Sequence, residues 1–422
     1  MERVCKDVLA PQFRGLEKYN IDDLFNTLST PSYVIDEAML RRNGEILKGI
    51  QDRTGCKILL AQKAFSNFNM YNILGNYLAG TEASGLYEAR LGAEKMPEGE
   101  VHVFCGAYKE PEFDELLKYA DHIVFNSVNQ LTKFGNRAKV AGKSIGIRVN
   151  PECSTKEGYE IYNPCAPGGR LGVTKAQWDD EMTPELIDSL DGIHFHTLCE
   201  QGAEALEVTL KAVEEKFGKY FSRLKWINFG GGHHITKDDY NIELLESLIN
   251  HIQSKYQVVV YLEPGEACAL NAGYLVSEVL DITKNGDVTN AILDVSAACH
   301  MPDVIEMPYM PPVLRAKAME TYGNDMEHDL DGGFYTNVDK GAVYRLGGPT
   351  CLSGDIIGDY YFEDLIKIGN RVIFGDMAIY TTCKNNTFNG MPLPSIYALK
   401  ENGDLVELIS FGYEDFKVRL GK

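Results

Sequence analysis

The stretch that decides the fold is KILLAQKAFSNF, residues 57–68. Ile58, Leu59 and Leu60 form a short apolar run typical of a buried strand, and Lys63 follows at its end among apolar residues. A lysine in apolar surroundings is costly unless it is paired, neutral or covalently occupied. A desolvated amine is what Schiff-base chemistry requires. The simpler alternative is a strand-end lysine that reaches solvent by its long stem.

Short apolar strands recur along the chain, separated by helical patterns. They are predicted at 57–60, 80–84, 101–104, 122–125, 144–149, 192–196, 225–228 and 258–262. Helices are predicted at 37–51, 203–217 and 239–255, the last capped by Asp238 or Asp239. Eight strands separated by helices match an α/β fold of the (β/α)8 type. A doubly wound open sheet is the alternative, but no GxGxxG motif follows an early strand.

The last third of the chain has a different pattern. From about Tyr274 strand-like runs replace the helical periodicity, and Asn402-Gly403 is a good hairpin turn. We therefore predict a barrel over residues 31–274 and a second, β-rich domain over residues 275–422.

Three segments complete this division. An early strand at 32–35 is expected to join the β domain, although it precedes the barrel in the sequence. Residues 1–30 are expected to be an N-terminal extension. Residues 315–340 are rich in charge and glycine and are expected to form an inserted loop.

The composition argues against several classes of protein. A length of 422 residues allows two domains with ample core. No apolar run could span a bilayer and no secretory signal is expected, which argues against a membrane partner. The ten cysteines include no CxxC pair, which disfavours zinc ribbons and disulfide scaffolds and favours a reducing cytoplasm. The net charge of -20 argues against nucleic acid as a partner.

Chemically competent residues lie at or just after the carboxyl ends of five predicted barrel strands, the face where such barrels place their active sites. They are Lys63, Ser84, His196, the glycines Gly230, Gly231 and Gly232, and Glu263. Each alone is a weak signal, because a triple glycine is often only a tight turn and a lone histidine is often structural. Their shared position relative to five strands indicates one pocket.

Together these residues describe a pocket for pyridoxal 5'-phosphate. Lys63 would hold the aldehyde as a Schiff base, and the glycine backbone would offer N–H groups to the phosphate. Glu263 would keep the pyridine nitrogen protonated, which makes the ring an electron sink. His196 could stack on the face of the ring.

At this point the sequence resembles a known family, the alanine-racemase-like group of ornithine and diaminopimelate decarboxylases, over residues 30–415. The motifs are AQKAF at 61–65, FHTLCEQ at 195–201, FGGGH at 229–233, EPGEA at 263–267, GPTCLSGD at 348–355 and MAIYT at 377–381. The resemblance implies a pyridoxal-phosphate barrel paired with a β domain.

The resemblance also implies residue roles. Lys63 is similar to the Schiff-base lysine, His196 to the ring-stacking histidine and Glu263 to the pyridine partner. Phosphate contacts and supporting positions are implied for Gly231, Gly232, Tyr380, Ser84, Glu88 and Arg170. Cys351 resembles a cysteine that reaches into the active site of the other subunit of a head-to-tail homodimer, where it would act as the catalytic proton donor.

Two departures narrow the substrate class. Most members carry EPGR, whose arginine helps hold the phosphate, whereas Glu266 stands there in this chain; Leu352 replaces a glutamate of the CESGD motif. With YNPCAPGGRLG and HMPDVIEMPY, these departures are similar to the branch that decarboxylates carboxynorspermidine and carboxyspermidine in polyamine biosynthesis.

A carboxypolyamine carries several separated ammonium groups, so its pocket should offer carboxylates. Glu266, Asp303, Glu306 and Asp355 lie near the motifs and are the expected substrate contacts, although each could equally be a solvated loop acid. A glutamate beside a phosphate is repelled unless a cation intervenes, for which a substrate ammonium and a nearby lysine are candidates.

Other functions stay open at this point. His194 and His196 alternate on one strand, and with Glu263 or Asp294 they could ligate zinc in a hydrolytic barrel. That alternative gives Lys63 and the glycines no shared role. A pyridoxal-phosphate carrier without enzyme activity, a diaminopimelate or other basic amino-acid decarboxylase, and an amino-acid racemase are the remaining alternatives.

Overall fold

A computed structural model describes residues 9–155, 163–319 and 341–421. The chain divides into two compact units, one formed by Leu40–Cys268 and the other by the residues through Met39 together with those from Ala269 onward. Among the helices of the described residues, none has the length and apolar character that a membrane crossing requires.

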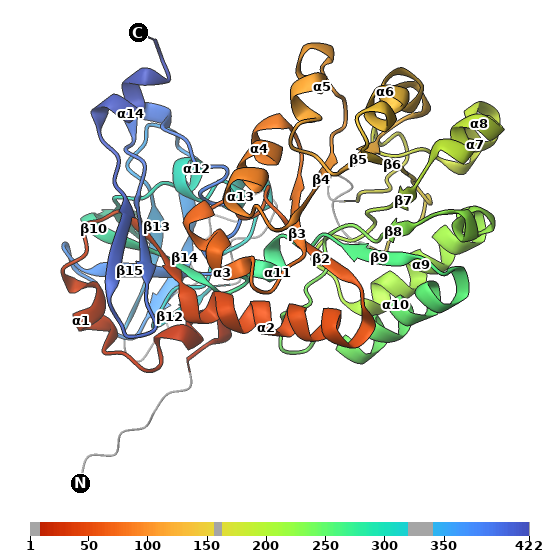
Figure 1. Ribbon diagram of the computed structural model, residues 1–422. Coiled ribbons are helices and arrows are strands. Elements are labelled where there is room, and N and C mark those ends of the chain that lie inside the picture. The colour runs from red at the N-terminus through yellow and green to blue at the C-terminus, as the bar shows by residue number, and fades with distance from the viewer. Residues whose placement is uncertain (1–8, 156–162, 320–340, 422) are drawn as a thin grey trace. The chain divides into compact units, whose positions relative to one another are not determined.

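The unit Leu40–Cys268 is built on a closed barrel of parallel strands (Figure 1). The strands are β2 (Lys57–Ala61), β3 (Gly80–Ala83), β4 (Glu100–Phe104), β5 (His122–Phe125), β6 (Ser144–Arg148), β7 (Gly192–His194), β8 (Trp226–Asn228) and β9 (Val259–Leu262). Each strand pairs with the next, and β9 closes the ring on β2 through the register Lys57↔Tyr261. The (β/α)8 prediction is confirmed. The open doubly wound alternative is wrong, because a closed ring has no edge strand.

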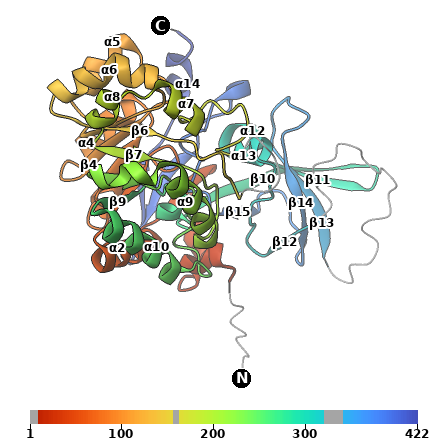
Figure 2. The same cartoon turned by 90° about the vertical axis from the view of Figure 1, so that its right-hand side faces the viewer.

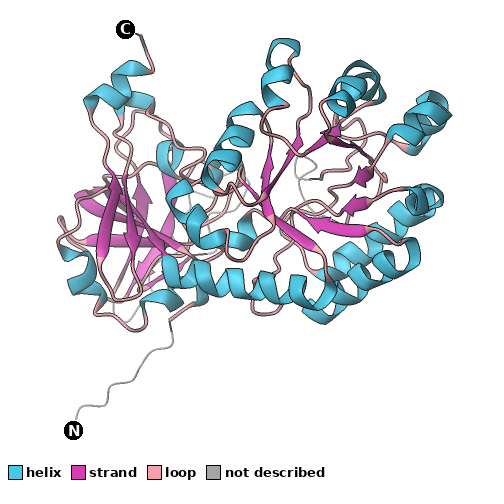
Figure 3. Cartoon of the chain, viewed as in Figure 1, coloured by secondary structure: helices cyan, strands magenta, loops and turns pink. Residues whose placement is uncertain are grey.

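Helices surround the barrel strands, as the colouring by secondary structure shows (Figure 3). They are α2 (Glu37–Thr54, which begins in the other unit), α3 (Tyr71–Leu74), α4 (Leu86–Lys95), α5 (Glu110–Leu116), α6 (Val128–Val140), α7 (Lys175–Glu181), α8 (Pro184–Ser189), α9 (Ala203–Phe217), α10 (Ile242–Tyr256) and α11 (Glu266–Ala269). In α9 the residues Leu206, Leu210, Val213 and Phe217 are buried at helical spacing, which explains why its bounds could be predicted.

Helix α10 begins later than predicted. Its N-cap is Asn241, whose side-chain oxygen accepts a hydrogen bond from the backbone N–H of Leu244 at 3.1 Å. Asp238 and Asp239, the predicted caps, lie before this position. Any short acceptor side chain can satisfy the first free N–H groups of a helix, so the sequence did not distinguish Asn241 from the two aspartates before it.

The amino-terminal half of the barrel is filled by Trp226. A Cβ atom at Gly146 or Gly192 would clash with the indole ring, so these strand glycines make room for it. The indole N–H donates a hydrogen bond to the hydroxyl of Ser144 at 2.9 Å. This end of the barrel is therefore a packed core, as expected for a barrel of this size.

Within the described residues, the second unit contains a nine-stranded mixed sheet, part of which is seen in Figure 2. Its strands are β1 (Ser32–Asp36), β10 (Gly273–Asn285), β11 (Val288–Leu293), β12 (Ala316–Ala318), β13 (Ala342–Gly347), β14 (Ile356–Phe362), β15 (Arg371–Gly375), β16 (Ser395–Leu399) and β17 (Leu405–Ile409). The predicted β-rich second domain is therefore present. β16 and β17 form the antiparallel pair expected around Asn402-Gly403.

Strand β1 lies inside this sheet, antiparallel to β10 and parallel to β16. The register pairs Ile35 with Gly273, so β10 begins two residues before the expected boundary between residues 274 and 275. The compact units themselves divide between Cys268 and Ala269.

The described part of the N-terminal extension has regular structure. A 3₁₀ turn (Pro11–Leu16) and α1 (Ile21–Asn26) bury Phe13, Leu16 and Phe25 in a core shared with Tyr274. Three short helices of this unit were not predicted: α12 (Ala297–His300), α13 (Asp303–Glu306) and α14 (Tyr413–Val418). Of the predicted insertion at 315–340, β12 forms a strand, and residues 320–340 lie outside the described residues.

Candidate active site at the carboxyl end of the barrel

Lys63 follows the carboxyl end of β2 on a tight turn. The N–H of Ala64 donates to the carbonyl of Ala61 at 3.2 Å, and a Cβ at Gly265 would lie 2.8 Å from that same carbonyl oxygen. Ala61, Ala64 and Phe65 are buried, whereas Lys63 itself is exposed. The predicted desolvated lysine is therefore not found in this chain, because the apolar neighbours pack beneath the turn and the side chain projects from it.

Glu82, on β3, is a buried carboxylate that faces the charge of Lys63. Burial raises the pKa of Glu82, the negative charge of Glu263 raises it further, and the Lys63 ammonium opposes both. Its Oε2 atom has no hydrogen-bond partner among the described residues. A buried carboxylate oxygen left in this state favours a donor or a cation as neighbour.

Glu263, directly after β9, is held by two side chains from neighbouring strands. Its oxygens lie 3.0 Å from His194 Nε2 and 2.6 Å from Asn228 Nδ2. Burial by itself would raise the pKa of Glu263, but the attraction and hydrogen bond of His194 and the hydrogen bond of Asn228 lower it. Glu263 therefore carries a fixed negative charge, whereas Glu82 tends to bind a proton.

His196 lies two residues beyond β7, which ends at His194 and is shorter than predicted. The N–H of Gly231 donates to His196 Nδ1 at 3.1 Å. Burial lowers the pKa of His196 well below its ordinary value, and the positive charges of Lys63 and Arg148 lower it further. The imidazole is therefore neutral, with its second nitrogen carrying the proton.

The glycine loop after β8 leaves no room for side chains. A Cβ at Gly230 or Gly231 would lie 2.5 Å from the carbonyl oxygens of Phe195 and Glu263 respectively, and Gly230 and Gly232 have positive φ angles of 70° and 83°. Only glycine adopts this path without strain. The loop therefore presents bare backbone at the carboxyl end of the barrel.

Arg148 ends β6 as a buried cation among these groups. Its guanidinium donates to the carbonyl of His196 at 3.4 Å and lies 4.7 Å from the ring centroid of Phe104. The Phe104 ring in turn is parallel to that of His194, with centroids 5.4 Å apart. Burial lowers the pKa of Arg148 to about 10, which leaves it charged at neutral pH.

The supporting positions form local contacts. The backbone N–H of Ser84 donates to the carboxylate of Glu88 at 2.6 Å, and the Ser84 side chain is exposed. The carbonyl of Arg170 accepts a hydrogen bond from Asn126 at 2.9 Å.

The other predicted site residues belong to the second unit. Cys351 is exposed in the loop between β13 and β14, and its N–H donates to the side chain of Asn389 at 3.3 Å. Tyr380 follows β15 with a positive φ of 51°. Asp355 is buried and accepts hydrogen bonds from Ser296 at 2.9 Å and Thr350 at 2.6 Å, so it braces the loop that carries Cys351.

Two expected substrate carboxylates already have a cation. Asp303 and Glu306, at the two ends of α13, both form ion pairs with Lys384. These pairs raise the pKa of Lys384 even though its burial lowers it. The sequence placed Lys384 far from both acids, so this neutralisation could not be predicted.

Sequence reasoning missed three residues of the barrel site: Glu82, Arg148 and Asn228. All three belong to short apolar strands, where a charged or amide side chain is unexpected. A polar side chain in an otherwise apolar strand was the available signal for a site residue, because it points either into the barrel or out to the surrounding helices.

The zinc alternative finds no matching geometry. Among the described residues, the group of three or more potential ligands with mutually close atoms is Glu100, His102 and His122. His194 instead pairs with Glu263, and Asp294 belongs to the other unit.

The barrel-end residues fit pyridoxal 5'-phosphate. Bare backbone suits a phosphate, a fixed carboxylate suits a protonated pyridine nitrogen, and Lys63 is an accessible amine. A closed parallel barrel with such a site at the carboxyl ends of its strands is typical of barrel enzymes that use pyridoxal 5'-phosphate. The chain belongs to one family within that class: residues 32–378 match the family described as pyridoxal-dependent decarboxylase, C-terminal sheet domain. It is therefore a decarboxylase with pyridoxal 5'-phosphate as its cofactor.

Several relatives match over nearly the whole chain. A carboxynorspermidine/carboxyspermidine decarboxylase of Campylobacter jejuni is 41% identical over 94% of this chain and 99% of its own length. A carboxyaminopropylagmatine decarboxylase of Synechocystis is 37% identical, over 94% and 96% respectively. A solved structure also matches, that of the Campylobacter jejuni carboxynorspermidine decarboxylase in complex with norspermidine. Its TM-score is 0.82, and the match covers 93% of this chain and 100% of that chain.

Proposed function

We propose that this protein removes the carboxylate from a carboxylated polyamine, with carboxynorspermidine and carboxyspermidine as its substrates. The observation that carries the proposal is the 41% identity with the Campylobacter jejuni enzyme along almost the full length of both chains. The diaminopimelate decarboxylase of Buchnera aphidicola from Acyrthosiphon pisum, at 25% identity, supports the shared fold and reaction class rather than the substrate.

The second candidate substrate is carboxyaminopropylagmatine, which the relative from Synechocystis is named for. It ends in a guanidinium rather than an ammonium group. Both cations would be attracted by carboxylates in the pocket, so charge alone does not separate them.

The residues of the barrel support the reaction in separate ways. The cofactor, when bound, supplies an electron sink for the electron pair that the departing carboxylate leaves behind. Lys63 holds the cofactor covalently, and the Glu263 carboxylate, fixed by His194 and Asn228, stabilises a proton on the pyridine nitrogen. Neutral His196 offers an uncharged ring face beside Lys63. Tyr380 and the glycine backbone contribute to holding the phosphate.

Cys351 is the proton donor in this proposal, acting from the partner subunit of a head-to-tail homodimer in the cytoplasm. Its exposure and the bracing of its loop by Asp355 support a role that needs a second chain. Cys351→Ala should lower kcat by roughly ten- to a thousand-fold while the cofactor stays bound, since proton donors commonly contribute such factors. A stable variant that turns over as fast as the wild type would remove Cys351 from the mechanism.

The direct test is to assay carbon dioxide release from four compounds: carboxynorspermidine, carboxyspermidine, carboxyaminopropylagmatine and meso-diaminopimelate. We expect the first two to have the highest kcat/KM. A clear preference for carboxyaminopropylagmatine would move the protein to the second candidate. Turnover of meso-diaminopimelate alone would contradict the proposed substrate class while leaving the family intact.

A further inference from the structure

Cys351 lies near the tip of the loop between β13 and β14, residues 348–355, and hydrogen bonds close this loop at its base. The N–H of Gly348 donates to the carbonyl of Asp355 at 3.0 Å, and the N–H of Asp355 donates to the carbonyl of Leu352 at 2.9 Å. Asp355 is buried, whereas Cys351 and Leu352 are exposed. The thiol therefore belongs to an exposed tip on a fixed base.

A second loop of the same unit holds this tip. The side-chain oxygen of Asn389 accepts a hydrogen bond from the backbone N–H of Cys351 at 3.3 Å. Asn389 lies in the 3₁₀ turn Phe388–Gly390, with a φ of 61° and a ψ of 15°. Such left-handed backbone is tolerated by glycine, asparagine and aspartate far better than by other residues. Position 389 thus combines a left-handed backbone with a short side-chain acceptor.

The second loop is anchored to the same short helix as the base of the first. The side-chain N–H of Asn386 donates to the carbonyl of Ala298 in α12 at 2.8 Å. The side-chain oxygen of Asn386 in turn accepts the N–H of Phe388 at 2.9 Å. At the start of α12, Ser296 donates to Asp355 at 2.9 Å. Separate contacts to α12 therefore fix both the base of the Cys351 loop and the segment that holds its tip.

We propose that Asn389 is a positioning residue for Cys351, and that its side-chain amide holds the loop tip in the orientation from which the thiol gives up its proton. A proton donor must lie within hydrogen-bond reach of the atom that it protonates, and a displacement of about 1 Å is enough to slow such a step. The inference rests on the proton-donor role proposed above for Cys351. It adds the side chain that sets where this donor lies.

The first test is Asn389→Gly, which removes the acceptor and leaves the left-handed backbone unstrained. We expect kcat for carbon dioxide release from carboxynorspermidine to fall roughly three- to tenfold, the rate equivalent of one hydrogen bond. Denaturant titration of the same samples shows whether the variant is folded. A folded Asn389→Gly variant that turns over as fast as the wild type would overturn the proposal.

A double-mutant cycle with Cys351→Ala separates positioning from a general structural role. Without the thiol there is nothing for Asn389 to position, so Asn389→Gly should change kcat by less than about 1.5-fold in the Cys351→Ala background. An equal loss in both backgrounds would show that Asn389 acts only on the stability of the unit, and the assignment would be wrong.

A conservative variant provides the rescue. Asn389→Asp keeps both the acceptor and the tolerance for left-handed backbone, and its added charge is screened because position 389 is exposed. Its kcat should lie closer to the wild-type value than that of Asn389→Gly. A loss as large as that of the glycine variant would contradict the hydrogen bond as the cause.

The matched control is Asn402→Gly. The side-chain oxygen of Asn402 also accepts a backbone N–H, that of Asp404 at 3.1 Å, in the exposed turn between β16 and β17. The same substitution there should leave kcat unchanged.

Failure of the proton-donor role and failure of the positioning role give different results. If Cys351→Ala turns over as fast as the wild type, the proton-donor role itself fails. If Cys351→Ala is slow and Asn389→Gly is not, only the positioning role fails.

Discussion

At the amino-terminal end of the barrel, Lys57 and Glu100 lie beside His102 and His122. At the carboxyl end, Lys63 and Glu263 lie near His194 and His196. In the first group both carboxylate oxygens have partners: Lys57 forms an ion pair with Glu100, whose Oε2 also accepts a hydrogen bond from Tyr261 at 2.9 Å. Beside the second group, Glu82 Oε2 has no hydrogen-bond partner among the described residues. The same residue types thus form a structural cluster at one end and a ligand site at the other.

The amino-terminal group also contains two stacked imidazoles. The rings of His102 and His122 are 3.9 Å apart and nearly parallel, at 12°. Their Nε2 atoms lie 3.2 and 3.8 Å from the same oxygen of Glu100. The possible ligand atoms of these three residues lie within 4.8 Å of one another, but Glu100 is already paired with Lys57. What is unpartnered there is the Nδ1 atom of each ring, not a carboxylate oxygen. An unpartnered carboxyl oxygen, rather than residue composition, therefore distinguishes the two ends.

The largest contrast is expected between the two lysines that flank β2. Lys63→Ala should reduce kcat by roughly a thousand-fold or more, because the covalent attachment of the cofactor is lost. Lys57→Ala, at the other end of the same strand, should keep kcat within about twofold of the wild type. Carbon dioxide release by the two variants measures this directly. Comparable losses in two stably folded variants would abolish the distinction between the ends.

The two glutamates should separate activity from stability. Glu263→Gln removes the fixed charge and should lower kcat roughly a hundred-fold. Glu100→Gln should leave kcat unchanged. It should lower the free energy of unfolding by about 1–2 kcal/mol at pH 7, because the partly exposed carboxylate that pairs with Lys57 is removed. Denaturant titrations and kcat measured on the same samples test both statements.

The pH dependence of the Glu100 effect has a defined sign. Burial would raise the pKa of Glu100, but the hydrogen bonds from His102, Lys57 and Tyr261 lower it well below its ordinary value. Its charged form is therefore stabilised in the folded state, and that stabilisation is complete above the unfolded pKa of about 4.3. The difference between wild type and Glu100→Gln should shrink as pH falls below this value. A constant difference down to pH 3 would contradict the assigned ion pair.

Metal addition provides a further test of the amino-terminal cluster. Because Lys57 already neutralises Glu100 and the rings are stacked, a stoichiometric amount of Zn²⁺ should change the Tm of the holoenzyme by less than about 1 °C. Retention of one zinc per chain, lost in His102→Ala, would show that this end is a binding site after all.

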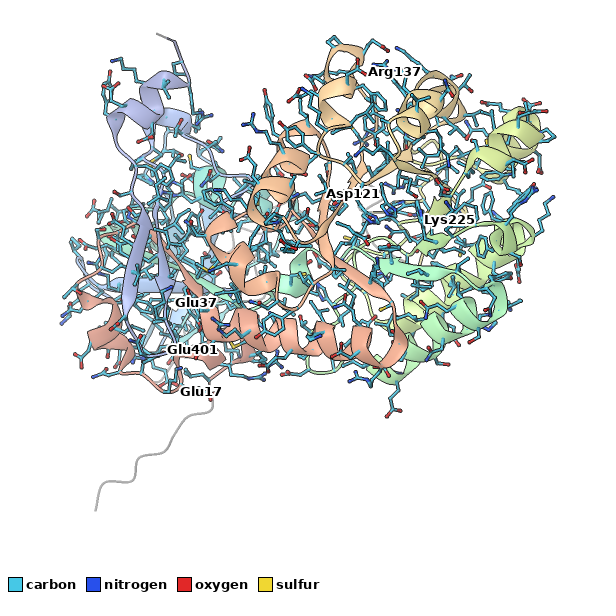
Figure 4. The ribbon with its side chains drawn as sticks, in the orientation of Figure 1. Glu17, Glu37, Asp121, Arg137, Lys225 and Glu401 are labelled. Carbon is cyan, nitrogen blue, oxygen red and sulfur yellow. The ribbon has the colours of Figure 1, made fainter. Side chains whose placement is uncertain are left out.

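The smallest effect is expected at Lys225, labelled in Figure 4 beside β8. Its ammonium lies 2.9 Å from Asp191, but the side chain is 79% exposed. Asp191 has a second partner in Lys139 at 2.6 Å. Lys225→Ala should therefore lower the free energy of unfolding by less than about 0.5 kcal/mol, and less still at high salt. Unfolding titrations at two salt concentrations check this value.

The barrel could be predicted from sequence because its strands are short apolar runs in regular alternation with helices. The site was predicted to the extent that its residues follow strand ends, as Lys63, His196 and Glu263 do. Glu82 and Arg148 escaped because they stand within strands, where periodicity offers no reason for a charge.

Long-range pairing accounts for the remaining differences. The sequence predicted Asp303 and Glu306 as substrate contacts, but Lys384 pairs with both from a distant part of the chain. Likewise, nothing in the sequence specified that the side chain of Glu266 would meet His234. Such pairs are consequences of tertiary packing, which local patterns do not encode.

The position of β1 between β10 and β16 has a consequence for biosynthesis. All five residues of β1 are buried in the finished sheet, but β1 is translated before the entire barrel and before either neighbour. The barrel can close once β9 is made, whereas β1 stays an unpaired apolar segment until β10 follows. Nascent chains that end before β10 should therefore expose Tyr33, Val34 and Ile35 to chaperones, and chains that extend past β16 should not.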